Sequence, residues 1–170
     1  MVYIDAHQGY LEKAKSVMEG HITFMDKASM LVAHVVDPQP GERILDCCAA
    51  PGGKSMHMAS LMNNTGAIMS CDIYDHKLEL MNQNAERLGA SIVSTKLQDG
   101  RYLPDNWKGQ FDRVLVDAPC SGLGILQKKL DMRWRKTQSL LTVLPPLQLE
   151  ILEKAAEMLK VEGYLVYTTC

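Results

Sequence analysis

The chain has 170 residues, a length that corresponds to a single domain. Hydrophobic residues make up 46% of it and charged residues 22%, as in an ordinary globular protein, and no apolar run approaches the ~20 residues of a membrane span. The net charge of −2 supplies no overall attraction for nucleic acid, so binding to RNA or DNA would need a local basic patch.

Five cysteines stand at positions 47, 48, 71, 120 and 170, without a Cys-x-x-Cys pair or a histidine at zinc-finger spacing. This pattern predicts reduced thiols in a cytoplasmic protein and no structural metal site. Cys47 and Cys71 stand in or beside apolar stretches, where a buried thiol is the simplest interpretation. The N-terminus has no basic stretch followed by an apolar one, so we expect no export signal.

The first predicted helices precede any strand. Residues 10–19 have the pattern of a short amphipathic helix. Asp26 is placed as the N-cap of the next helix, which Pro38 stops. This second helix carries the apolar residues Ala28, Met30, Leu31 and Val35.

Strands and helices then alternate along the chain. Strands are predicted over residues 43–46, 67–71, 91–96, 111–116 and 164–167. Helices are predicted over residues 54–62, 75–88 and 147–159, with Asp75 as the cap of the second and Gly163 beyond the end of the third. Apolar strands that alternate with amphipathic helices indicate an α/β fold with a mostly parallel sheet covered on both faces.

Polar residues mark the carboxyl ends of the predicted strands. Those at or just past a strand end are Asp46, Asp72, Asp99, Asp117 and Cys170. Ligands of parallel sheets bind beyond these ends. A single carboxylate there is usually a turn cap, but several of them beside a glycine-rich loop indicate a shared binding site.

The glycine-rich loop follows the first strand and opens a helix, where small residues let a ligand approach backbone N–H groups. A dinucleotide is disfavoured as its ligand because the Gly-x-Gly-x-x-Gly spacing is absent. A P-loop nucleotide site matches at Gly53-Lys54-Ser55, with residues 114–117 as its metal-holding strand. However, Cys48 stands where that motif needs its first glycine, and Pro51 interrupts the loop.

S-adenosylmethionine is the third candidate ligand, and it accounts for all the strand-end acids. The loop would pass close to its methionine part. Asp72, which follows the loop by about 20 residues, is placed to bind both ribose hydroxyls. Asp99 is placed to accept a hydrogen bond from the adenine amino group. We therefore favour a site for S-adenosylmethionine.

Cys120 and Cys170 each follow a predicted strand, in Asp117-Ala-Pro-Cys120-Ser and Tyr167-Thr-Thr-Cys170. A cysteine thiolate that adds to carbon 6 of cytosine makes carbon 5 nucleophilic enough to take a methyl group. A base then removes the proton from carbon 5, and the thiol leaves. Two strand-end cysteines beside a cofactor loop favour this chemistry, which by itself does not decide which of them is the nucleophile.

Three separated motifs together resemble those of the Sun-type (Nop/Sun) RNA cytosine-5 methyltransferases, and in particular the group of ribosomal RNA small-subunit methyltransferase B. They are Asp46-x-Cys-Ala-Ala-Pro-Gly-Gly-Lys54, Asp117-Ala-Pro-Cys120-Ser and Thr169-Cys170. The resemblance implies a Rossmann-like class I methyltransferase fold, S-adenosylmethionine as cofactor, small-subunit ribosomal RNA as partner and 5-methylcytosine as product.

The resemblance also implies roles for matching residues. Cys170 is expected to be the nucleophile and Cys120 to assist product release, with Asp117 and Lys54 in the catalytic set. The implied cofactor contacts are Cys48, Ala49, Ala50, Pro51, Gly52, Gly53, Lys54, Asp72, Asp99 and Asp117. A basic stretch is expected to hold RNA phosphates and an unstacked base. Its residues are Lys128, Lys129, Arg133, Trp134 and Arg135.

In the resembled family the sheet continues past the Thr-Cys strand, and RNA-binding segments precede the catalytic domain. We therefore expect residues 1–25 to be the remnant of such a segment and residues 26–170 to be a catalytic core that is incomplete at its C-terminus. Such a chain would be a monomer with a self-associating strand edge. A terminal carboxylate on Cys170 would disfavour its thiolate, so the chain would bind S-adenosylmethionine but methylate RNA poorly. The alternatives are a P-loop-like nucleotide-binding protein and an inactive cofactor- or RNA-binding fragment.

Overall fold

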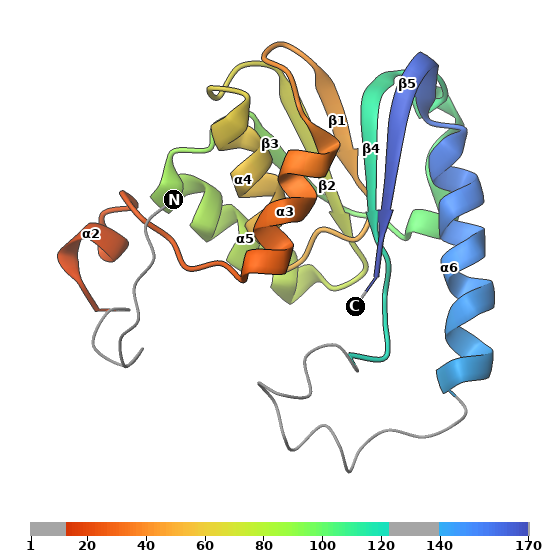
Figure 1. Cartoon of the computed structure of the whole chain (residues 1–170), viewed down its shortest axis with the longest axis horizontal. Helices are drawn as coiled ribbons and strands as arrows, with labels where there is room; N and C mark the ends of the chain where they lie inside the picture. The colour runs from red at the N-terminus through yellow and green to blue at the C-terminus, as the bar shows by residue number, and fades with distance from the viewer. Residues whose placement is uncertain (1–12, 123–139, 170) are drawn as a thin grey trace.

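A computed structural model describes residues 13–122 and 140–169. Its sheet is parallel throughout, with the strand order β3-β2-β1-β4-β5, so that β3 and β5 form the edges of the described sheet (Figure 1). The strands are β1 (Arg43–Asp46), β2 (Ala67–Asp72), β3 (Val93–Leu97), β4 (Phe111–Asp117) and β5 (Leu159–Thr168). The α-helices are α2 (Lys15–Met18), α3 (Lys27–Val36), α4 (Gly53–Leu61), α5 (Asp75–Leu88) and α6 (Leu140–Ala156), and short 3₁₀ helices are η1 (Gly100–Tyr102) and η2 (Asp105–Trp107).

Helices cover both faces of the sheet, as the sequence predicts. Figure 1 shows α3, α4 and α5 on one side and α6 on the other. On the first side, Ile44, Ile68 and Leu115 pack against methionines of α4. On the second side, Leu45 and Val114 pack in one cluster with apolar side chains of α6. Burial on both faces explains why the central strands are apolar without alternation.

Helix α3 begins where the sequence predicts, and it buries residues other than the apolar ones named from the sequence. The Asp26 side chain accepts a hydrogen bond of 2.9 Å from the Ala28 N–H, which confirms the predicted N-cap. The buried residues of the helix are Ala33 and Val36, whereas Leu31 and Val35 are 61% and 66% exposed. This helix is apolar on more than one side, so its periodicity does not determine which side meets the sheet.

The helix before β5 is also displaced from its prediction. It begins at Leu140 instead of residue 147 and runs through Pro145 and Pro146. Proline removes N–H donors from a helix and is a signal against helix, so this start could not be read from the local sequence. Both prolines are exposed and lie in the first half of α6.

Strand β5 is longer than predicted and begins at Leu159 instead of residue 164. Gly163, predicted to follow the end of a helix, lies inside this strand at a bulge, where the register with β4 shifts and Glu162 has a φ of 67°. A Cβ atom on Gly163 would lie 3.0 Å from the Asp112 carbonyl oxygen, so the bulge favours glycine.

Helix α6 also ends at Ala156 instead of residue 159, and α2 begins at Lys15 although the helix was predicted over residues 10–19. The boundaries of the other predicted strands and helices hold to within two residues. One cap is corrected: Asp75 is the first residue of α5 and Tyr74 is its N-cap. Asp75 therefore interacts favourably with the helix dipole from the first turn instead of capping the helix. At the other end, Gly89 has a φ of 67° and ends α5 as predicted.

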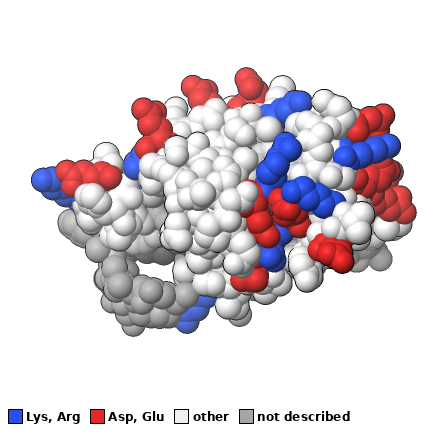
Figure 2. All heavy atoms as spheres, turned by 90° about the horizontal axis from the view of Figure 1, so that it is seen from above, with Lys and Arg blue, Asp and Glu red and all other residues white. Residues whose placement is uncertain are grey.

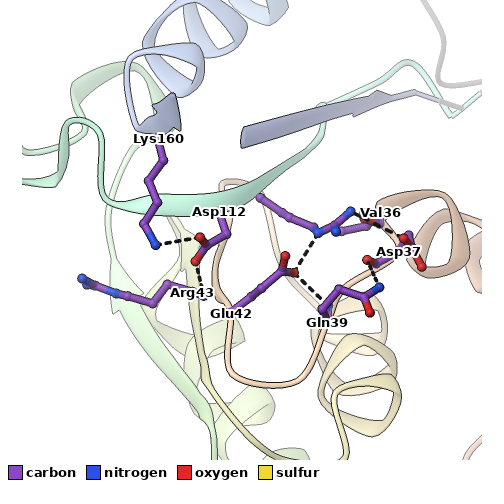
Figure 3. A network of polar contacts seen from close by, with 8 residues as sticks. Val36, Asp37, Gln39, Glu42, Arg43, Asp112 and Lys160 are labelled. Carbon is purple, nitrogen blue, oxygen red and sulfur yellow. Dashed lines mark hydrogen bonds and ion pairs between the residues drawn. The ribbon is translucent and has the colours of Figure 1, made fainter. Parts of the chain in front are cut away.

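Charged side chains join the elements at the amino ends of the strands (Figure 3). The Arg113 guanidinium donates to the Glu42 carboxylate at 2.7 Å and to the Val36 carbonyl at 2.6 Å, and it lies 5.2 Å from the centre of the Tyr164 ring. Beside it, Asp112 accepts from the Lys160 ammonium at 2.6 Å. Arg113 therefore joins the end of α3 to the start of β1 and to strands β4 and β5.

We expect Arg113→Met to lower the free energy of unfolding by about 2–3 kcal/mol, because the Glu42 carboxylate and a helix-terminal carbonyl lose a largely buried partner. Urea denaturation measures this loss. Lys108→Met is the matched control, since the exposed Lys108 pairs with acids at the surface and its removal should leave the midpoint unchanged. Equal midpoints for the two variants would contradict this account of Arg113.

Candidate functional site

The loop after β1 is held at the carboxyl ends of the neighbouring strands. The Cys47 N–H donates to the Leu115 carbonyl at 2.9 Å, and the Ala49 N–H donates to the Cys71 carbonyl at 2.8 Å. Gly52 has a φ of 96°, and a Cβ atom there would lie 2.9 Å from Cγ of Met81. The position therefore requires glycine, both for its conformation and for its close packing on α5.

Helix α4 starts directly after this loop, and no side chain caps its N-terminus. The first N–H groups of a helix have no partners within the helix, and they lie at the positive end of its dipole. Gly53 and Lys54 are the first two residues of α4. The loop and the helix start together form a small-residue surface that can receive an anionic group such as a carboxylate.

Asp46 does not join the ligand site, although the sequence groups it with the other strand-end acids. It is fully buried beneath the loop. Its Oδ2 accepts from the Ser55 hydroxyl at 2.7 Å, and the Ser55 hydroxyl oxygen accepts from Ser70 at 2.9 Å. Its Oδ1 has no hydrogen-bond partner among the described residues. Burial raises the pKa of the Asp46 carboxyl to about 7, against the opposing effect of the Ser55 hydrogen bond.

Asp72 and Asp99 follow β2 and β3 and keep part of their carboxylates accessible. Asp72 accepts from the Ala50 N–H at 3.3 Å and from the Tyr74 N–H at 3.1 Å, and its side chain is 10% exposed. Asp99 caps η1 and is held by the Arg101 guanidinium, with the shortest contact at 2.7 Å. The hydrogen bond from Arg101 lowers the pKa of Asp99, which keeps it ionised.

Asp117, at the end of β4, joins three elements of the site. Its Oδ2 accepts from the Lys54 ammonium of α4 at 2.6 Å, and its Oδ1 accepts from the Thr168 hydroxyl of β5 at 2.7 Å. The side chains of Lys54 and Asp117 are 19% and 31% exposed, so both can still be reached from solvent. The structure thus brings together the two charged residues that the sequence places in the catalytic set.

The cysteines fall into two groups. Cys47 and Cys71 are buried as predicted, and burial raises the pKa of the Cys47 thiol well above its usual value and that of Cys71 to about 12. Burial also raises the pKa of the Cys48 thiol to about 12, so these thiols remain protonated at neutral pH. Cys120 lies half-buried three residues past Asp117, at the same end of the sheet as the loop. It forms a disulfide, so the prediction of reduced thiols is wrong for this residue.

Some predicted residues cannot be placed. Cys170 and the predicted RNA-binding residues Lys128, Lys129, Arg133, Trp134 and Arg135 lie outside the described residues. On the face seen in Figure 2, basic and acidic side chains of the described part are mixed, in keeping with the small net charge.

In the described part of the chain, no group of three or more His, Cys, Asp or Glu residues could hold a metal ion. Within residues 13–122 and 140–169, no helix has the length and apolar character of a membrane span.

Sequence reasoning missed several residues that shape the site. Thr168, Ser55 and Arg101 each bind one of the strand-end acids. Thr168 stands inside a motif that we singled out, next to the two residues that carried the resemblance. Gln148, which binds the Pro119 carbonyl, carries no signal in the sequence, because it is one polar residue among the apolar residues of a helix.

The structure also contains a cavity of about 540 Å³ away from these acids. It lies between residues 20–25, α4 and α5, and it shares Pro51, Gly52 and Gly53 with the loop. The strand-end acids Asp72, Asp99 and Asp117 do not line it. The cavity is therefore separate from the site at the carboxyl ends of the strands.

Residues 33–170 match the family model described as "16S rRNA methyltransferase RsmB/F". The chain belongs to this family. The family assignment confirms the resemblance that the three sequence motifs indicate, and the parallel sheet is that of the Rossmann-like class I methyltransferases. The match includes the glycine-rich loop, the Pro-Cys motif and the Thr-Cys motif of this RsmB/F-family chain.

Individual relatives agree with the family assignment. The chain is 45% identical over 152 residues to the probable ribosomal RNA small subunit methyltransferase B of Bacillus subtilis, which covers 89% of this chain and 34% of that protein. It is 37% identical over 171 residues to human tRNA (cytosine(72)-C(5))-methyltransferase NSUN6, covering 91% and 35% of the two chains. The solved structure of NSun6 from Pyrococcus horikoshii superposes with a TM-score of 0.86 at 33% identity, over 94% of this chain and 40% of that one. The chain thus spans about a third of the length of these curated relatives.

We expect the buried Asp46 to make stability depend on pH. Its folded pKa of about 7 is raised, so its contribution is fully present below the unfolded pKa and is lost as pH rises toward 7. The free energy of unfolding of the original chain should therefore fall relative to that of Asp46→Asn as pH rises from 4 to 7. The change in this difference should be on the order of 3–4 kcal/mol. Urea denaturation at several pH values measures this difference.

Asp112→Asn is the matched control with the opposite sign. Burial raises the pKa of Asp112, but the hydrogen bonds from Lys160 and from the Arg43 N–H, together with the charge of Lys160, outweigh that effect and lower the pKa overall. The contribution of Asp112 is thus present above its unfolded pKa and is lost as pH falls through its folded pKa.

A stability difference between Asp46→Asn and the original chain that is independent of pH would show that Asp46 is ionised in the folded protein.

Proposed function

We propose that the chain is the catalytic core, over residues 26–170, of an S-adenosylmethionine-dependent RNA (cytosine-5)-methyltransferase that acts on small-subunit ribosomal RNA. The observation that carries this proposal is the meeting of Lys54, Asp117 and Thr168 beside the glycine-rich loop, at the end of the strand that leads to Cys120. The family assignment and the names of the relatives support it.

The residues present fit S-adenosylmethionine. The uncapped start of α4 suits the carboxylate of its methionine part, and the small loop residues from Cys48 to Gly53 allow close approach. Asp72 suits the ribose hydroxyls, and Asp99 suits the adenine amino group. A solved structure of the P. horikoshii relative contains SFG, an analogue of S-adenosylmethionine. When bound, S-adenosylmethionine supplies the methyl group.

Lys54 and Asp117 are suited to hold the target base. A carboxylate accepts hydrogen bonds from the amino group of cytosine, and an ammonium donates to its ring nitrogen or carbonyl oxygen. Asp117 is held in place by the Thr168 hydroxyl and Lys54 by its ion pair with Asp117, so their orientations are set before the base arrives. We assign these two residues to orienting the cytosine.

The proposed reaction proceeds through a covalent adduct. The Cys170 thiolate adds to carbon 6 of cytosine, which makes carbon 5 nucleophilic, and after methyl transfer a base removes the proton from carbon 5. The Cys170 thiolate then leaves, and Cys120 assists this release. The assignment of the two cysteines rests on the Thr-Cys and Pro-Cys motifs of the family. The stretch from Lys128 to Arg135 is proposed to hold the RNA backbone and the unstacked base.

Ribosomal RNA is preferred over transfer RNA as the substrate because identity is higher to the B. subtilis relative, at 45%, than to human NSUN6, at 37%. An RNA substrate of this kind and the free thiols of Cys47, Cys48 and Cys71 support a cytoplasmic location. We further propose a monomer, with β5 at the edge of the described sheet as the surface for any self-association.

Calorimetry tests the cofactor assignment. The 170-residue chain should bind S-adenosylmethionine and not ATP, and Asp72→Asn should weaken the binding about ten-fold or more, because a charged acceptor for two hydroxyls is lost. Asp75→Asn is the control, since this exposed acid lies three residues away and should leave the affinity unchanged. Binding of ATP in place of S-adenosylmethionine would support the P-loop alternative.

Adduct trapping tests the roles of the cysteines, in a version of the chain continued beyond Cys170. Cys170→Ala should abolish formation of 5-methylcytosine, whereas Cys120→Ala should accumulate a protein–RNA adduct that survives denaturing electrophoresis. The double variant is the control and should form no adduct. An adduct in Cys170→Ala but not in Cys120→Ala would reverse the two roles.

A further inference from the structure

The side-chain amide of Gln148 forms one hydrogen bond through its nitrogen and another through its oxygen. Its Nε2 donates to the Pro119 carbonyl at 2.8 Å, and its Oε1 accepts from the Tyr167 hydroxyl at 3.0 Å. Pro119 directly precedes Cys120, and Tyr167 directly precedes the Thr168 that binds Asp117. Figure 1 shows α6 running alongside β5, with the chain leaving β4 at the end where β5 also ends. One side chain of α6 thus joins the Pro-Cys loop to the end of β5.

The chemistry of the partners fixes the orientation of this amide. The Pro119 carbonyl can only accept a hydrogen bond, so the amide nitrogen must face it. The amide oxygen then faces the Tyr167 hydroxyl, which can donate. No reversed arrangement satisfies the Pro119 carbonyl. A carboxylate or an apolar side chain at position 148 would leave that carbonyl without its donor.

Besides the disulfide of Cys120, the described hydrogen bonds that hold the backbone of the Pro-Cys loop are few. The register of β4 with β5 ends at the pair Asp117 and Thr168, and the Ala118 N–H makes one further bond of 2.9 Å to the Thr168 carbonyl. Pro119 has no N–H, so its backbone can be held through the carbonyl alone. The hydrogen bond from Gln148 therefore holds the backbone directly before Cys120.

We propose that Gln148 is a positioning residue for Cys120, acting through the Pro119 carbonyl and supported by Tyr167. The proposal rests on the proposed function, in which Cys120 assists product release. Loss of the Gln148 amide should then impair release of the adduct and leave cofactor binding intact, because the described hydrogen bonds of its side chain go to Pro119 and Tyr167, not to the loop after β1 or to Asp72.

The first test measures the position of Cys120 without catalysis, in the reduced 170-residue chain. Alkylation of Cys120 by iodoacetamide, followed by peptide mass spectrometry, should be at least three-fold faster in Gln148→Leu and Gln148→Glu than in the original chain. Gln148→Glu keeps an acceptor for Tyr167 and loses the donor to Pro119, so it remains informative if the leucine variant does not fold. Glu153→Gln, at an exposed position of the same helix, is the control and should label at the original rate. Unchanged or slower labelling in both Gln148 variants would overturn the proposal.

The second test measures catalysis in the version continued beyond Cys170. Gln148→Leu should lower kcat about ten-fold or more, with the affinity for S-adenosylmethionine within two-fold of the original, and should accumulate the protein–RNA adduct as Cys120→Ala does. Tyr167→Phe should show the same pattern more weakly. A general structural defect would weaken cofactor binding and yield no adduct, and that result would overturn the proposal. If the unchanged protein forms no 5-methylcytosine, the proposed function fails, while the labelling experiment still decides the role of Gln148.

Discussion

The ion pair between Lys54 and Asp117 is the interaction on which the arrangement of the site depends. It joins the start of α4 to the end of β4 at 2.6 Å, and the Thr168 hydroxyl joins the same carboxylate to β5. Residues from three distant parts of the sequence are thereby held at one end of the sheet. A parallel sheet makes this possible, because all its strands deliver their carboxyl ends to the same edge.

Burial separates the acids of this edge into two roles. Asp46 lies beneath the loop, where the cost of removing a charge from water raises the pKa of its carboxyl to about 7. Asp72, Asp99 and Asp117 lie above it, are held by backbone N–H groups or basic side chains, and remain accessible. The buried acid supports the loop from below, and the accessible acids form the ligand surface.

The two ends of the sheet are built differently. At the amino ends, the largely buried Arg113 side chain pairs with the Glu42 carboxylate, donates to the Val36 carbonyl and stacks near the Tyr164 ring. These contacts join α3, β1, β4 and β5. At the carboxyl ends, the polar groups keep part of their surface open, and the anchor of the Pro-Cys loop comes from Gln148 on α6. A rigid base can thus support loops whose side chains remain available to a ligand.

The sequence by itself determined the alternation of strands and helices, the glycine-rich loop, the strand-end acids and the family motifs, because these depend on residues that are neighbours along the chain. Tertiary structure alone decided which face of α3 is buried, how far β5 extends past its bulge, that Asp46 is enclosed, and that Gln148 meets Pro119. Leu31 and Val35 show the reason plainly. Periodicity records which side chains share a face, but burial and hydrogen bonding depend on partners that the fold brings from elsewhere in the chain.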